Sequence, residues 1–155
     1  MVVKSIISKQ YRDKVNQAAV KANAIIWPTE GWLCTARKAL SMSAAQLARR
    51  LGVTRAQVSK TEKGELHGSV TLKTLQSMAK AMGCRFVYAI VPEGKVEDIL
   101  AARAKEKARQ RVEESHKHMA LEDQTLSANQ IKFEIARLQK EILQNPPADF
   151  WDNER

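Results

Sequence analysis

Apolar residues recur along most of this chain at the 3.6-residue period of an α-helix, and they divide it into helical segments. The predicted helices span 4–26, four short segments within 32–83, about 95–119, and 128–144. Pro28 and Gly31 end the first helix, and Pro146-Pro147 stops the last. The pattern therefore predicts a mainly α fold.

Two short helices near the middle of the chain begin with the same capping signal. Ser43 is followed three residues later by Gln46, and Thr54 by Gln57. Each pair predicts a capping box, in which the two residues satisfy backbone N–H groups reciprocally. Gly52 lies between the helices, where the first must end in a left-handed conformation that favours glycine. A short glycine-containing turn between crossed helices is typical of a helix-turn-helix.

The exposed face of the second helix favours DNA binding over the alternative, a helical hairpin inside a bundle with no ligand. It offers long donors and small residues, with no acid before Glu62. Arginine can bind two acceptors of guanine, and lysine can reach guanine or phosphate. The candidate base-reading residues are Arg55, Ala56, Ser59 and Lys60. The candidate DNA-backbone contacts are Ser43, Arg49, Arg50, Thr54, Gln57 and Lys63.

Positive charge is concentrated in the same region. The net charge of the chain is +9, and residues 31–92 carry ten Lys or Arg against only Glu62 and Glu65. Residues 93–155 carry more acids than bases. A localised basic field is what a polyanionic partner requires, although a solubilising surface would have the same composition.

The sequence over roughly 33–83 resembles the repressor family of the lambda and 434 phages, also called the XRE family. The resemblance rests on residues 42–64, on a supporting helix over 32–40, and on Thr71-Leu-Lys-Thr-Leu75. It implies that Arg55, Ala56 and Lys60 read bases, with Thr54 and Gln57 at the DNA backbone. Two positions depart from the family pattern: Ala44 replaces a frequent Gln, and Thr61 replaces a customary Ile or Leu.

A narrower resemblance covers most of 30–125. It is carried by Glu30-Gly-Trp32, Gly68-Ser-Val-Thr-Leu-Lys-Thr-Leu75, Cys84-Arg-Phe-Val-Tyr-Ala-Ile-Val-Pro92 and His118-Met-Ala-Leu-Glu-Asp-Gln124. These segments look like the "mobile mystery protein A" group, whose members are commonly encoded beside a Fic-domain protein. The resemblance implies an antitoxin-like regulator of its own promoter, with a Fic-domain protein as a partner.

Residues 85–91 are rich in β-branched and aromatic side chains, which predicts a strand bounded by Gly83 and Pro92. The chain offers no second strand, so pairing with a second copy across a two-fold axis is expected, and a homodimer would read an inverted repeat. The alternative is a strand-like segment packed on the helices of its own chain. The predicted dimer strand comprises Arg85, Phe86, Val87, Tyr88, Ala89, Ile90 and Val91.

The last third of the chain carries an amphipathic stripe and an aromatic tail. The stripe is either core or a surface for a partner protein, and the tail either anchors the same partner or folds back onto its own domain. The alternative function is that of a protein that binds and neutralises a partner protein through these residues. The candidate partner-binding residues are Ile131, Ile135, Leu138, Ile142, Phe150 and Trp151.

Neither catalysis nor a membrane location is indicated. Cys34 and Cys84 are not part of a CxxC pair, and the three histidines lack a nearby carboxylate or cysteine constellation. We therefore expect no enzyme activity, metal, cofactor or small-molecule substrate. With no signal peptide and no run of 18 apolar residues, we expect a cytoplasmic protein.

These observations predict three regions: an N-terminal helix over 1–30, a helix-turn-helix DNA-binding domain with a dimerisation strand over 31–92, and a helical extension with a tail over 93–155. The predicted function is that of a DNA-binding transcriptional regulator whose partners are double-stranded DNA and a second copy of itself.

Overall fold

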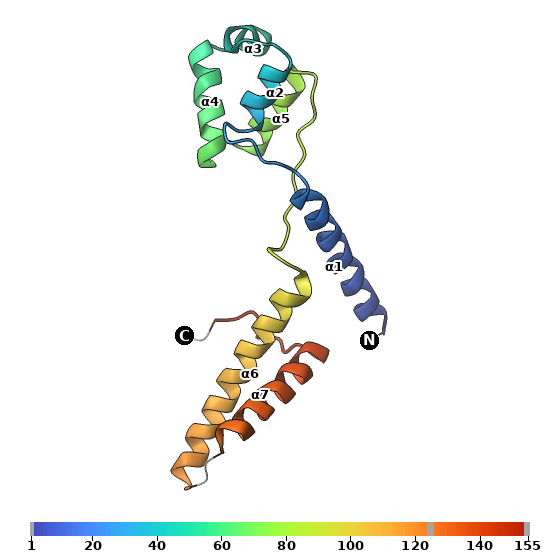
Figure 1. Ribbon diagram of the computed structural model, residues 1–155, viewed down its shortest axis with the longest axis vertical. Coiled ribbons are helices and arrows are strands. Elements are labelled where there is room, and N and C mark those ends of the chain that lie inside the picture. The colour runs from blue at the N-terminus through green and yellow to red at the C-terminus, as the bar shows by residue number, and fades with distance from the viewer. Residues whose placement is uncertain (1, 124–125, 154–155) are drawn as a thin grey trace. The chain divides into compact units, whose positions relative to one another are not determined.

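A computed structural model describes residues 2–123 and 126–153. Within these residues the chain forms seven α-helices and no strand (Figure 1), which confirms the mainly α class. The helices are α1 (Val2–Asn23), α2 (Trp32–Ala39), α3 (Ala44–Leu51), α4 (Arg55–His67), α5 (Leu72–Ala81), α6 (Val96–Leu121) and α7 (Ala128–Gln144).

The strand predicted over 85–91 is not formed. Residues 84–92 have no regular secondary structure, because a strand requires a paired neighbour and no other described segment supplies one. The segment does not pack on its own helices either, since Val87, Tyr88 and Ile90 remain exposed. The rings of Phe86 and Tyr88 stack with centroids 5.9 Å apart, as alternate residues of an extended segment can.

The chain divides into two compact units, which we describe separately. The central unit comprises residues 21–89, and the terminal unit comprises residues 1–20 together with 90–155. The chain therefore passes between the units within α1 and again within the extended segment.

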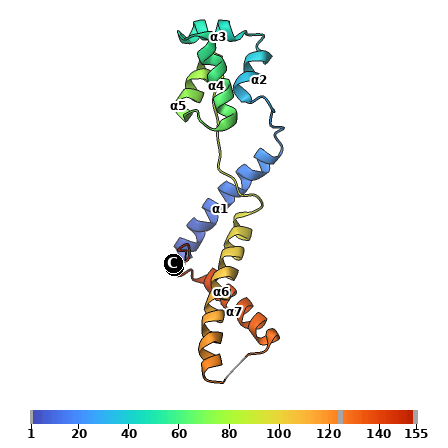
Figure 2. The same cartoon turned by 90° about the vertical axis from the view of Figure 1, so that its left-hand side faces the viewer.

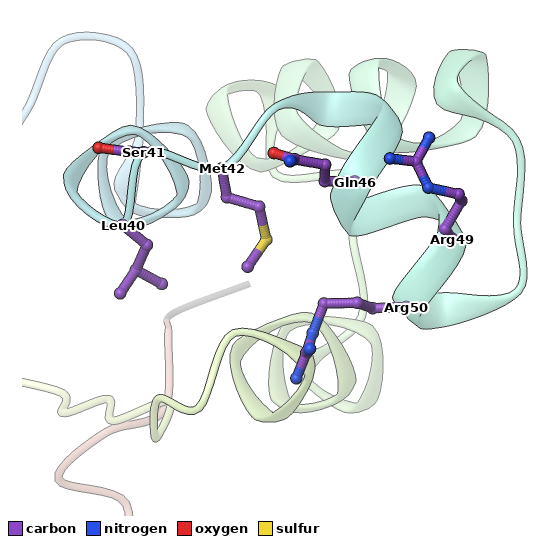
Figure 3. A pocket seen from close by; sticks show the side chains of 6 residues that line it. All are labelled: Leu40, Ser41, Met42, Gln46, Arg49 and Arg50. Carbon is purple, nitrogen blue, oxygen red and sulfur yellow. The ribbon is translucent and has the colours of Figure 1, made fainter.

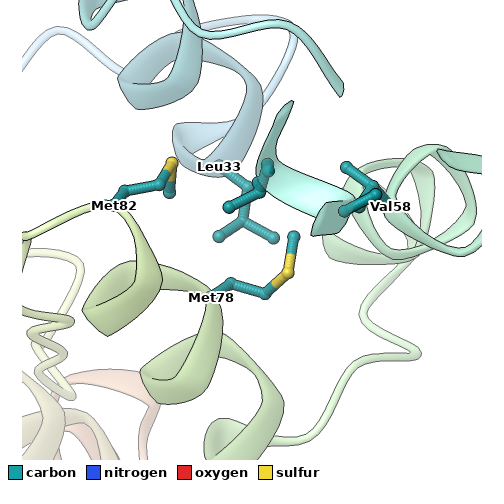
Figure 4. Close-up of a cluster of buried hydrophobic side chains, with 6 residues drawn as sticks. Leu33, Val58, Met78 and Met82 are labelled. Atoms are coloured by element: carbon teal, nitrogen blue, oxygen red, sulfur yellow. The ribbon is translucent and has the colours of Figure 1, made fainter. Parts of the chain in front are cut away.

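The central unit is built on one apolar core to which all four of its short helices contribute. Leu33, Leu47, Val58, Met78 and Met82 are buried against one another, from α2, α3, α4, α5 and the C-cap of α5 (Figure 4). Leu47 is fully buried and Val58 is only 1% exposed. Burial of side chains this large is the main stabilising contribution in a domain of this size, and here it fixes how α4 lies against its neighbours.

The terminal unit is built on a helical hairpin. α6 and α7 lie side by side and run antiparallel (Figures 1 and 2). Ala104 and Ala108 of α6 are fully buried, and their small side chains allow Ile142 of α7 and Phe150 of the tail to pack closely. Ser127 begins α7 with a capping box formed with Gln130.

The tail after α7 is held by two bases of α6. The guanidinium of Arg103 donates hydrogen bonds to the backbone oxygens of Phe150 (2.7 Å) and Asp152 (2.6 Å). Lys107 is almost fully buried and lies 3.6 Å from the Asp149 carboxylate. The tail is therefore part of the hairpin.

The first helix contacts the beginning of α6 through polar groups. Asn16 accepts a hydrogen bond from the backbone N–H of Val96 (2.9 Å) and donates one to Glu97 (2.9 Å). Asn16 thereby satisfies one of the free N–H groups that every helix start presents. The helix ends at Asn23, three residues before the predicted end.

Candidate nucleic-acid interface

The helix caps that begin α3 and α4 hold the two central helices at fixed starting points. At Ser43 both halves of the predicted box are present: its N–H donates to Gln46 (2.8 Å), and the Gln46 N–H donates to its hydroxyl (3.1 Å). At Thr54 only one half is present, the bond from the Gln57 N–H to the Thr54 hydroxyl (3.1 Å). The second box is therefore a simple N-cap.

The turn between α3 and α4 has the conformation expected from its glycine. Gly52 has φ 70° and ψ 31°, in the left-handed region, and the N–H of Val53 bonds to the Ala48 carbonyl (3.0 Å). A Cβ at Gly52 would meet nothing within 4 Å, so the backbone angle, not space, calls for glycine here. Ala48 is 4% exposed on the inner face of α3, where a small side chain lets the neighbouring helix approach.

The helix α4 presents two chemically different faces. Val58, Thr61 and Gly64 are buried on one side of it. At about 100° per residue, the other side carries five residues within an arc of about 140°. They are Arg55, Ala56, Ser59, Lys60 and Lys63, of which Ser59 is half-buried and the others are exposed. The predicted base readers therefore share one accessible face.

The acids of α4 are both occupied by contacts with α2. Glu62 forms a two-point ion pair with Arg37 (Nε to Oε1 2.6 Å, Nη2 to Oε2 3.2 Å), and both side chains are nearly buried. Arg37 also donates to the Met42 carbonyl (2.9 Å). The hydrogen bonds to Glu62 raise the pKa of the Arg37 guanidinium, so Arg37 stays charged.

Glu65 caps α2 from the neighbouring helix. Its carboxylate accepts hydrogen bonds from the N–H groups of Trp32 (2.8 Å) and Leu33 (3.0 Å), at the positive end of α2. Gly31 makes this approach possible, because a Cβ there would lie 2.7 Å from the Glu65 carboxylate. With Glu62 and Glu65 both directed at α2, the exposed arc of α4 contains no acid.

Comparison with known protein families bears on the same segment. Residues 35–88 match the model of a helix-turn-helix family. The central unit contains an XRE-type helix-turn-helix domain. No curated protein matches the chain. No solved structure matches it either. In this domain α3 and α4 are the two helices joined by the Gly52 turn.

The two arginines at the end of α3 differ in their surroundings. Arg50 points toward α5 and donates from Nε to the Ala81 carbonyl (2.7 Å), whereas Arg49 points away from that helix (Figure 3). Arg50 thus satisfies a carbonyl at the end of α5, a contact that its sequence position did not indicate. Both line an open hollow of about 510 Å³ beside the turn that precedes α3.

Thr61 departs from the family pattern and lies in the core, and its hydroxyl group has a hydrogen-bond partner. Thr61 is 7% exposed, and its hydroxyl donates to the Gln57 carbonyl one turn earlier (2.8 Å). Such a bond to the preceding turn removes the cost of burying a hydroxyl. The replacement of a customary Ile or Leu by Thr61 therefore leaves no unsatisfied hydroxyl in the core.

The sequence analysis missed one basic residue that lies beside α4. Lys73, in the first turn of α5, lines a groove of about 340 Å³ together with Gln57 and Thr74. The Thr71 cap that begins α5 places it there. The signal in the sequence was a threonine cap followed two residues later by a lysine.

The candidate partner-binding residues are split by the fold of the terminal unit. Ile135, Leu138, Ile142 and Phe150 pack in the core of the hairpin, which agrees with the core alternative and with a tail folded back. Ile131 is half-buried. Trp151 is exposed and lies against Arg103, 5.9 Å from the ring centre to the guanidinium carbon.

Two other kinds of feature are absent from the described residues. None of their helices is long and apolar enough to span a membrane. In the same part of the chain, no three His, Cys, Asp or Glu residues are grouped so that they could hold a metal ion.

Proposed function

We propose that this protein is a sequence-specific DNA-binding regulator of transcription, not an enzyme, and that α4 enters the major groove. The observation that carries the proposal is the composition of the exposed arc of α4. Three bases and two small residues face outward there, while both acids of the helix bind α2. A bundle helix without a ligand has no need to separate its charges in this way.

The roles within the interface follow from side-chain chemistry. Arg55 and Lys60 reach base edges, with Ala56 and Ser59 allowing close approach of the helix. Thr54 and the free N–H groups at the start of α4 bind phosphate. Lys63, Arg49 and Lys73 supply further positive charge at the margins. Arg50 contributes its charge while it remains bonded to α5.

The finer part of the proposal rests on the resemblance over 30–125. On that basis the protein is an antitoxin-like autorepressor that binds an inverted repeat as a homodimer, and its operon encodes a Fic-domain partner. The steep basic bias of residues 31–92 supports DNA as the partner of the central unit.

Selection of bound duplexes from a randomised DNA library tests the proposal and identifies the operator sequence in the same experiment. The wild-type protein should enrich one sequence motif, and Arg55→Ala should relax it at one position and weaken binding by about 1–3 kcal/mol. Arg55→Lys keeps the charge and loses the two-point contact, so it should relax the motif and keep the salt dependence.

Lys38→Ala is the matched control, because it removes one exposed positive charge from α2 instead of α4. It should leave the enriched motif unchanged. If the wild-type protein enriches no motif, or if Arg55→Ala enriches the same motif with the same affinity, the assignment of α4 is wrong.

A second candidate function is supported by the outer surface of α7. Phe133 is 69% exposed there, and with Ala136, Lys140 and Leu143 it lines a hollow of about 480 Å³. An exposed apolar site of this kind fits a partner protein, here the Fic-domain product of the neighbouring gene. Phe133→Ala should abolish co-purification of the two proteins, whereas the exposed neighbour change Lys132→Ala should not. Equal co-purification with both variants would reject this candidate.

A further inference from the structure

We propose that residues 85–93 pair with the same residues of a second copy, as an antiparallel two-stranded ribbon centred on Ala89. The proposal deepens the homodimer named above by specifying its interface and register. It concerns self-association in the absence of DNA, so it can fail while the proposed DNA binding stands.

The backbone of this segment is available for pairing. Within the described part of the chain, residues 85–91 form no backbone hydrogen bond; the last one before them joins the Cys84 N–H to the Ala79 carbonyl. An extended row of free N–H and C=O groups is a template for another strand. Tyr88 and Ile90 on one face are 68% and 88% exposed, and Val87 on the other face is 68% exposed, so these positions are uncovered on both faces of the template.

Two-fold symmetry restricts the possible registers. Hydrogen-bonded and non-hydrogen-bonded pairs alternate along an antiparallel ladder. Symmetry makes the pair i:j equivalent to j:i, so the axis must pass through a residue paired with its own copy. The centre of the segment allows Tyr88 or Ala89 as that residue.

The side chains favour Ala89. In that register Val87 lies opposite Val91 and Tyr88 opposite Ile90, which are β-branched and aromatic pairs of the kind that stabilise sheets. At each end the exposed Arg85 of one copy lies opposite the exposed Glu93 of the other. Neither residue forms an ion pair within the described part of its own chain. Centring on Tyr88 instead would place Arg85 opposite Val91 and leave the charges unmatched.

Pro92 is compatible with this register. It has no N–H, so it must occupy a non-hydrogen-bonded site, which here lies opposite Phe86. Alternation then places Tyr88 and Ile90 at non-hydrogen-bonded sites, where side chains approach most closely, and Ala89 at a hydrogen-bonded site. The segment thus complements itself in hydrogen bonding, side-chain size and charge, which is why a second copy is favoured over an unrelated peptide.

Cysteine cross-linking measures the register directly. In a background with Cys34→Ser and Cys84→Ser, Ala89→Cys should form a disulfide-linked dimer under mild oxidation. The two Ala89 Cα atoms would lie about 5.5 Å apart, within the range that a disulfide bridges. Tyr88→Cys is the control, because its copies would be diagonal neighbours about 7–8 Å apart and should not link.

Sedimentation without DNA tests the ribbon independently of cross-linking. An isolated two-stranded ribbon is marginal, so dimerisation should depend on protein concentration. Ala89→Pro removes an N–H from the ladder in both copies and lies outside every helix; it should raise the dimer dissociation constant at least tenfold with unchanged helix content. Linking through Tyr88→Cys but not Ala89→Cys overturns the register. A monomer at all concentrations, or a dimer unaffected by Ala89→Pro, overturns the pairing.

Discussion

The two units of this protein arrange their charges in opposite ways. In the helix-turn-helix domain the acids Glu62 and Glu65 bind α2, so the bases of α4 remain unneutralised. In the hairpin the acids lie beside the bases: Arg109 pairs with Glu106 and Glu113, and Arg137 with Glu134 and Glu141. The same residue types thus produce a strong positive field in one unit and a neutralised surface in the other.

The difference also concerns the energy of each ion pair. Arg37 and Glu62 are nearly buried, where a lone charge is costly, whereas the pairs that Arg109 and Arg137 form in the hairpin lie at the surface and are screened by water. The contrast indicates that the Arg37–Glu62 pair holds the geometry of the first unit and that the surface pairs of the hairpin serve its solubility. Substitutions in each unit test this contrast.

Glu62→Ala should have the largest effect. It leaves the Arg37 guanidinium buried without its partner, so unfolding of the helix-turn-helix domain should become easier by about 2–4 kcal/mol. Chemical denaturation followed by circular dichroism measures the loss. Arg37→Met combined with Glu62→Leu removes both charges and should recover most of the stability. A double variant as unstable as Glu62→Ala would contradict the explanation.

Gly31→Ala should come next. Gly31 has φ 85° and ψ 162°, a region that other residues rarely adopt, and the new Cβ would displace the Glu65 carboxylate from α2. The expected loss is about 1–3 kcal/mol of unfolding free energy. Gly94→Ala is the matched change at the start of the hairpin, where φ is not positive and the neighbour is a movable side chain. Equal losses would mean that the backbone angle at Gly31 is unimportant.

Ser43→Ala and Ser127→Ala compare identical caps in the two units. Each serine forms a complete capping box, so each change should cost about 1 kcal/mol in its own unit. Amide hydrogen exchange resolves the two units, and faster exchange should appear in α3 for the first variant and in α7 for the second. Thr54→Ala removes a cap with one bond fewer and should cost no more than Ser43→Ala.

Glu134→Gln should have the smallest effect. The hydrogen bonds and charge of Arg137 lower the pKa of the Glu134 carboxyl. A lowered pKa stabilises the folded state above the ordinary carboxyl pKa, and this contribution disappears as pH falls through the folded value. Because the pair lies at the solvent-accessible surface and is screened by water, the thermal midpoint at neutral pH should not change measurably, and only the acid limb of a pH series should shift slightly. A clear loss at neutral pH would show that the hairpin pairs are structural.

Much of the helix-turn-helix could be predicted from sequence because its signals are local. Ser43 with Gln46, Thr54 and Gly52 act within a few residues of themselves, and all three begin or end helices as predicted.

The remaining features depend on contacts between distant residues. The use of Glu65 to cap α2 requires a carboxylate and a helix start 33 residues apart to meet, and no pattern signals it. The bond from Arg50 to the Ala81 carbonyl joins two different helices, so the position of Arg50 in the sequence gave no sign of it. The strand over 85–91 was predicted from the alternation of its side chains, but a strand also needs a neighbour, which residues 2–123 and 126–153 do not provide.

The capping of α2 by Glu65 has a mechanical consequence. One carboxylate joins the second half of α4 to the first turn of α2, with Gly31 directly before it. The start of α2 is therefore tied to α4 by two hydrogen bonds in addition to the apolar core. A displacement of the backbone at Gly31 would act on α4 directly through these two bonds.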